Sequence, residues 1–134
     1  MTIRFANIRH WGIVFLFSFD AFDMERIIEA LVWAEAPDSI ISRVSENVIA
    51  GRRNEGFCFS DPSTRRSVIG IGKTSTGPEF LDSTVHEIMH IAQDIAREDD
   101  IDPYGEDIAY LAGDISKSIS DIVCIMSCPK CRHE

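Results

Sequence analysis

The spacing of hydrophobic residues along the chain predicts the order of its secondary structure elements. Residues 3–19 are rich in Ile, Val and Phe, and residues 13–17 form an unbroken apolar run, which is typical of a buried strand. Further along, apolar residues recur every three or four positions, which is the spacing of one helical face. The later predicted elements are helices over residues 24–36 and 38–50, strands over 56–60 and 66–73, and helices over 79–97 and 105–123.

This order of elements predicts an α+β fold class. The two later strands flank the turn residues Asp61, Pro62 and Ser63, so a hairpin is the simplest interpretation. We expect a small antiparallel or mixed sheet, with the helix over residues 79–97 packed against the second long helix near the C-terminus. A length of 134 residues suits one domain, which we place at residues 1–123, with a Cys-rich tail over 124–134.

Charge is unevenly distributed between the two halves of the chain. Residues 1–78 carry nine basic and nine acidic side chains, whereas residues 79–134 carry four basic and thirteen acidic ones, so the second half holds the whole net charge of −9. This field repels phosphate backbones and anionic membrane surfaces, which argues against nucleic acid and membrane as partners. Because no signal sequence is recognisable and the cysteines are few, we expect a cytoplasmic protein, or a virion-associated one if it derives from a phage.

The sequence His86-Glu87-Ile88-Met89-His90 matches the pattern H-E-x-x-H within a predicted helix. Residues four apart share a helical face, so the two imidazoles can bind one zinc ion. Glu87 is rotated by about 100° around the helix, where it can reach a water on the open side of the metal and act as general base. The other face of this helix is apolar; it comprises Val85, Ile88, Ala92 and Ile95.

A catalytic zinc site needs a third protein ligand. Glu106, at the start of the next predicted helix, is the best candidate, because an antiparallel helix pair would bring it back towards His90. It ranks ahead of three other carboxylates, Asp107, Asp102 and Asp114. The alternative interpretation is that Glu106 only complements the helix dipole.

These residues give the chain a resemblance to the Glu-zincin metallopeptidases. In particular, it is similar to the small zincin-like proteins of bacteriophage and prophage genomes, which pair H-E-x-x-H with a helix patterned E-x-x-A-Y-x-x-G, here residues 106–113. The resemblance covers roughly residues 68–119. It implies a minimal zincin-like domain with one Zn²⁺ per chain, held by His86, His90 and Glu106, and with Glu87 as the catalytic acid and base. Tyr110 stands where better-characterised members place an Asp.

Carboxylates near the motif could orient the metal-binding imidazoles through their second N–H group. Asp94 lies one turn after His90, and Asp114 lies two turns after Glu106; both are interpreted equally well as solvated acids. Tyr110 is a further supporting candidate. The glycines within residues 68–73 suggest a sheet edge at which a substrate backbone is aligned.

The C-terminal tail carries a second set of metal-binding side chains. Cys124, Cys128, Cys131 and His133 could form a second, structural zinc site. The alternatives are a frayed tail with reactive thiols, and a redox pair or disulfide.

The leading hypothesis for function is a zinc-dependent hydrolase, most specifically a metallopeptidase that cleaves a peptide or protein substrate through a metal-bound water activated by Glu87. One alternative is a non-catalytic, zinc-stabilised structural or assembly protein of a phage or prophage. The other is a metal-free helical adaptor whose acidic face binds a basic partner.

Overall fold

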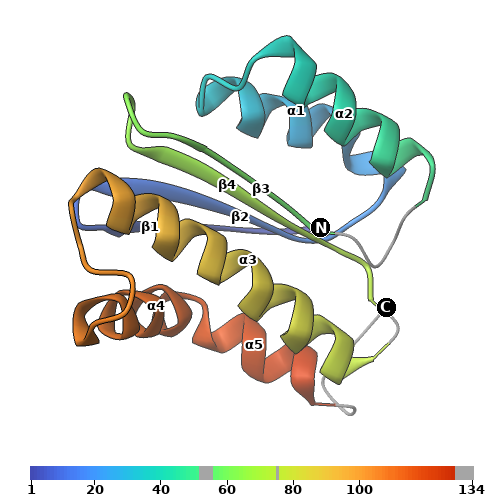
Figure 1. The fold of residues 1–134 in the computed structure, drawn as a ribbon. Coiled ribbons are helices and arrows are strands. Elements are labelled where there is room, and N and C mark those ends of the chain that lie inside the picture. The colour runs from blue at the N-terminus through green and yellow to red at the C-terminus, as the bar shows by residue number, and fades with distance from the viewer. Residues whose placement is uncertain (52–55, 75, 129–134) are drawn as a thin grey trace.

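A four-stranded sheet lies at the centre of the molecule (Figure 1). The computed structural model describes residues 1–51, 56–74 and 76–128. The strands are β1 (Thr2–Ile8), β2 (Trp11–Phe19), β3 (Phe57–Asp61) and β4 (Arg66–Gly72), and their order across the sheet is β1-β2-β4-β3. The two central strands run parallel, and each edge strand is antiparallel to its neighbour. The sheet is therefore mixed.

Helices cover both faces of this sheet (Figure 1). On one face lie α1 (Met24–Trp33) and α2 (Asp38–Ile49), preceded by the short 3-10 helix η1 (Ala21–Asp23). On the other lie α3 (Gly77–Glu98), α4 (Glu106–Ser118) and α5 (Ser120–Ser127). The expected α+β class, with a small mixed sheet, is thus confirmed. In the described residues, no helix is both long and apolar enough to cross a membrane.

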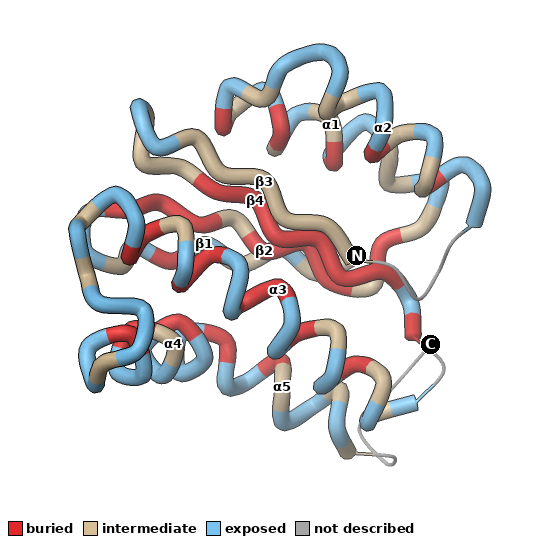
Figure 2. Tube along the Cα trace, viewed as in Figure 1, coloured by how far each residue is buried: buried red, intermediate tan, exposed pale blue. Residues whose placement is uncertain are grey.

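The central strands are apolar on both sides because each side packs against helices (Figure 2). Phe15 and Phe17 of β2 belong to the core beneath α3, α4 and α5, and Phe17 contacts the ring of Phe80 at a centroid distance of 5.9 Å. Leu16, which points to the opposite side, belongs to the core beneath α1 and α2. The long apolar run in the first part of the sequence follows from this double burial.

The first strand predicted from sequence is in fact a hairpin of two strands. Arg9 and His10 form its turn, and both have a positive φ, at 53° and 61°. Two-residue turns with this backbone usually contain Asn or Gly, which reach positive φ at little cost. Because neither residue type stands here, the sequence carries no turn signal at this point.

The single helix expected over residues 105–123 is interrupted at Ile119, so α4 and α5 are separate. Two serine hydroxyls precede the break: Ser116 donates to the Ala112 carbonyl at 2.8 Å and Ser118 to the Ile115 carbonyl at 2.6 Å. Such bonds compete with the helical backbone pattern. The break lets Ile119 become fully buried.

The expectation that residues 68–73 lie at a sheet edge is wrong. β4 is hydrogen-bonded on both sides, to β2 and to β3, and the edge on this side of the sheet is β3. Gly70 serves packing instead, because a Cβ atom there would overlap the ring of Phe57 on the neighbouring strand. The glycine makes room for a side chain of the protein itself.

Both hairpin turns are tied to the end of α3 by one arginine. Arg65 donates to the Asp99 carboxylate at 2.8 and 3.1 Å, and its guanidinium also donates to the backbone carbonyl of Arg9 at 2.7 Å. Arg9 in turn donates to Asp99 at 3.1 Å. The network joins the β1–β2 turn, the β3–β4 turn and the C-terminus of α3, and so fixes one end of the helix that carries H-E-x-x-H.

Candidate metal centre

Helix α3 carries the whole H-E-x-x-H motif and begins at a well-defined cap. The Thr76 hydroxyl accepts a hydrogen bond from the Glu79 backbone N–H at 3.2 Å, and Pro78 stands in the first turn, where its missing N–H costs no helical bond. The helix then packs on the sheet through a continuous buried face that includes Phe80, Ile88, Ile91 and Ile95. The motif therefore lies on a rigid element.

The imidazoles of His86 and His90 point towards each other on the exposed side of α3. Their Nε2 atoms lie 3.2 Å apart, and the ring centroids lie 4.8 Å apart. In the absence of metal, this distance suits a hydrogen bond from one ring to the other. Two nitrogens bound to one tetrahedral zinc at ~2.0–2.1 Å would be separated by about 3.3 Å. The pair therefore fits two neighbouring positions around one zinc ion.

Glu87 is buried beside this exposed pair. Its side chain is 8% exposed, and Oε1 lies 4.0 Å from His86 Nε2. Burial raises the pKa of Glu87, and the nearby imidazoles of His86 and His90 act in the opposite direction. None of the described residues gives this carboxylate a hydrogen bond, and a raised pKa with an unused proton acceptor is a common property of general bases.

The Glu87 carboxylate lies against the start of the edge strand β3. A Cβ atom added to Gly56 would lie 3.1 Å from Glu87 Oε1 and 2.8 Å from the Gly70 carbonyl oxygen, so the glycine allows this close approach. Burial, and then the negative charges of Asp94 and Glu87, raise the pKa of the Cys58 thiol. The charges of Glu87 and Asp94 thus both reach Cys58 on β3.

The structure does not bring Glu106 to the two histidines. Among the described residues, no three His, Cys, Asp or Glu side chains form a group that could hold a metal ion. His90 lies eight residues before the end of α3, about 12 Å along the axis, whereas Glu106 opens α4 just after the short connection. The assignment of Glu106, or of any other third ligand, stays a prediction.

The other carboxylates and the tyrosine considered as ligands or supporting groups lie mostly in solvent. Asp107, Tyr110 and Asp114 are exposed on α4, and Asp102 accepts a hydrogen bond from the Tyr104 backbone N–H at 2.9 Å. Asp94 is half-buried and lies one turn after His90. Of these groups, Asp94 is the best placed to support the histidine pair.

The structure covers only part of the Cys-rich tail. Cys124 is exposed within α5, which continues to Ser127, and Cys128 follows the helix in a half-buried position. Cys131 and His133 lie outside the described residues, so the predicted second zinc site stays a prediction.

Sequence reasoning missed several features around the motif. Gly56 gave no signal in the sequence, because it matters through the absence of a side chain. Thr84 gave none either; its buried hydroxyl, Oγ1, has no hydrogen-bond partner among the described residues. Val85 belongs to the apolar face of the helix by sequence but is 50% exposed. It lies at the border of the helical face, where the neighbouring elements decide burial.

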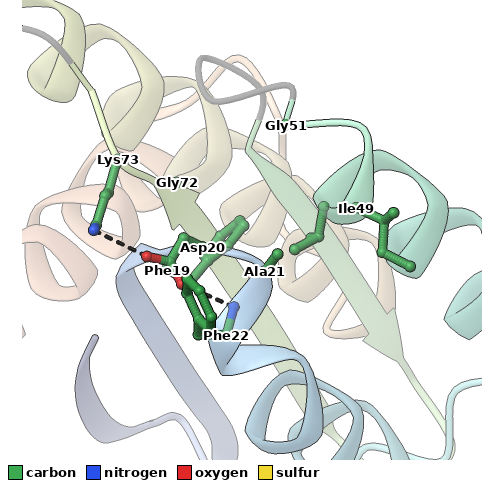
Figure 3. A pocket seen from close by; sticks show the side chains of 9 residues that line it. Phe19, Asp20, Ala21, Phe22, Ile49, Gly51, Gly72 and Lys73 are labelled. Carbon is green, nitrogen blue, oxygen red and sulfur yellow. Dashed lines mark hydrogen bonds and ion pairs between the residues drawn. The ribbon is translucent and has the colours of Figure 1, made fainter.

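A separate cavity of about 260 Å³ lies at the carboxyl ends of β2 and β4 (Figure 3). Its walls are mainly apolar, and an ion pair between Lys73 and Asp20, 2.9 Å long, lies at one side. The lining residues are Phe19, Asp20, Ala21, Phe22, Val48, Ile49, Gly51, Gly72 and Lys73. None of the residues of the candidate metal centre lines it.

Comparisons with protein-family models, with curated proteins and with solved structures gave no match to this chain.

Proposed function

We propose that this protein is a zinc-dependent hydrolase of the zincin-like kind, and most specifically a metallopeptidase. The observation that carries the proposal is the pair of Nε2 atoms 3.2 Å apart on an exposed helical face, with the carboxylate of Glu87 buried beside them. Groups with perturbed pKa values cluster at functional sites, so a carboxylate of raised pKa beside two converging imidazoles supports a catalytic role. The resemblance to the Glu-zincin pattern supports the same interpretation.

His86 and His90 would hold the metal, and Glu106 stays the candidate third ligand from the sequence. Zinc bound there would supply Lewis-acid polarisation of a substrate carbonyl and would acidify water. Glu87, held against Gly56, accepts the proton of the attacking water and passes it to the leaving amine. Burial serves this role, because desolvation raises the pKa of Glu87 and so makes its carboxylate a stronger proton acceptor.

Zinc content and hydrolysis, measured on matched variants, test the proposal. We expect one zinc per chain at the motif in elemental mass spectrometry, retained in Glu87→Gln and lost in His90→Ala, with peptide hydrolysis lost in both. His10→Asn is the control, because it removes an exposed histidine from a turn remote in sequence from the motif. Full hydrolysis by Glu87→Gln would contradict the mechanism, and a folded protein that takes up no zinc would contradict the proposal as a whole.

A second candidate function is a non-catalytic zinc-stabilised structural or assembly protein of the phage type. One observation favours it: among the described residues, only two ligands converge, and both are exposed, so a partner could complete the shell. Zinc-dependent association in sedimentation velocity, abolished by His90→Ala and accompanied by no hydrolysis, would favour this function over the hydrolase.

A further inference from the structure

The exposed side of α3 bears two parallel rows of residues with different chemistry. One row is apolar: Leu81, Val85 and Met89 stand four residues apart and are 47%, 50% and 37% exposed. The other row is ionisable, with the same spacing, and consists of Asp82, His86, His90 and Asp94. Residues four apart follow one another along a helix, so both rows run along its surface.

The apolar row flanks the histidine pair on the side away from Glu87. Successive residues are rotated by about 100° around a helix, so Val85 and Glu87 lie on opposite sides of His86. The Glu87 side is closed by Gly56 and the start of β3, whereas the Val85 side is open to solvent. A chain that crosses the histidine pair would therefore meet the general base on one side and the apolar row on the other.

The charge around these rows favours a cationic partner. Residues 79–134 carry thirteen acidic and four basic side chains, and Asp82 and Asp94 stand at the two ends of the ionisable row. Arg97, in the last turn of α3, is the one lysine or arginine of this helix. Anionic lipid and nucleic acid are repelled by such a surface, and a second copy with the same charge is repelled as well. Lysine and arginine side chains are attracted.

We propose that the row Leu81–Val85–Met89 binds a peptide segment in which a large apolar residue stands next to lysine or arginine. The apolar side chain covers the exposed row, and the basic residues lie towards Asp82 and Asp94. This inference rests on the proposed hydrolase function, because it gives the substrate class of the same site. It assigns the specificity of the site to contacts on α3 itself.

Two labelled peptides of equal length test this inference. One combines leucine and lysine, and the other has serine and glutamate at the same positions. Fluorescence anisotropy measures their binding to zinc-loaded Glu87→Gln protein, and cleavage is measured with the wild type. We expect the Leu81→Gln, Val85→Gln, Met89→Gln triple variant to bind the leucine–lysine peptide about tenfold more weakly, a change of about 1.4 kcal/mol. Its cleavage of this peptide should fall because KM rises. Val32→Gln, which alters a 58% exposed residue on α1, should change neither value.

The outcomes separate this inference from the proposed function. The inference is supported if the leucine–lysine peptide binds and the triple variant loses this binding. If the wild type then shows no turnover, the hydrolase proposal alone fails. If the wild type holds zinc and cleaves peptides, but both peptides bind equally or the triple variant binds as the wild type does, the inference is overturned and the hydrolase stands. Self-association that the triple variant abolishes also overturns it, because a second copy would then be the occupant.

Discussion

The carboxylate of Asp99 is expected to stabilise the fold by joining α3 to both hairpin turns. It accepts hydrogen bonds from Arg65 at 2.8 and 3.1 Å and from Arg9 at 3.1 Å. The substitution Asp99→Asn keeps the size of the side chain and removes its charge. We therefore predict that this variant folds normally but has a lower free energy of unfolding at neutral pH.

The size of the effect follows from the pKa of Asp99. Hydrogen bonds from Arg65, and then from Arg9, lower this pKa from 3.8 to about 2. A pKa that is lower by about 1.8 in the folded state corresponds to at most about 2.5 kcal/mol of stability. Because the Arg9 side chain is 53% exposed, solvent screens its share. We expect a loss of about 1–2 kcal/mol.

The pH dependence of this loss has a definite sign. A carboxylate with a lowered pKa in the folded state contributes its full stability above the unfolded pKa of 3.8 and loses it as the pH falls through about 2. About half of the contribution should remain at pH 3. Urea unfolding followed by circular dichroism, from pH 7 down to pH 3, measures this for the wild type, for Asp99→Asn and for the exposed control Asp82→Asn. An equal difference between wild type and Asp99→Asn at every pH would refute the electrostatic argument.

Two further substitutions test the surroundings of Glu87. Gly56→Ala would place a Cβ atom 3.1 Å from Glu87 Oε1, so we expect turnover to fall at least tenfold while the zinc content is retained. Gly113→Ala is the control, because a Cβ atom there meets no atom within 4 Å, and it should keep both turnover and zinc content. Unchanged turnover in Gly56→Ala would mean that the position of the Glu87 carboxylate against Gly56 does not matter for turnover. Thr84→Val removes a buried hydroxyl that has no hydrogen-bond partner among the described residues, so the free energy of unfolding should stay the same or rise by up to about 1 kcal/mol. Thermal unfolding measures this, and a clear fall in the midpoint temperature would mean that the hydroxyl makes a hydrogen bond in solution.

Local pattern was enough for most of the secondary structure and for the core of the candidate site. Helical and strand spacings depend only on neighbouring residues, so the helices, the β3–β4 hairpin and the α+β class could be predicted. The same holds for the histidine pair, because residues four apart on a helix share a face whatever surrounds it. The β1–β2 turn at Arg9 and His10 could not be predicted, because tertiary pairing of the strands holds two unsuited residues at positive φ.

The sequence by itself determined which residues share the face of α3 and how the charge divides between the halves of the chain. Only the tertiary structure decided that Glu87 is buried against Gly56 and that Val85 is exposed. The physical reason is that these outcomes depend on contacts between elements far apart in the sequence. A helix fixes the direction of each side chain relative to its own axis, whereas burial and the distance to another helix depend on what packs against it.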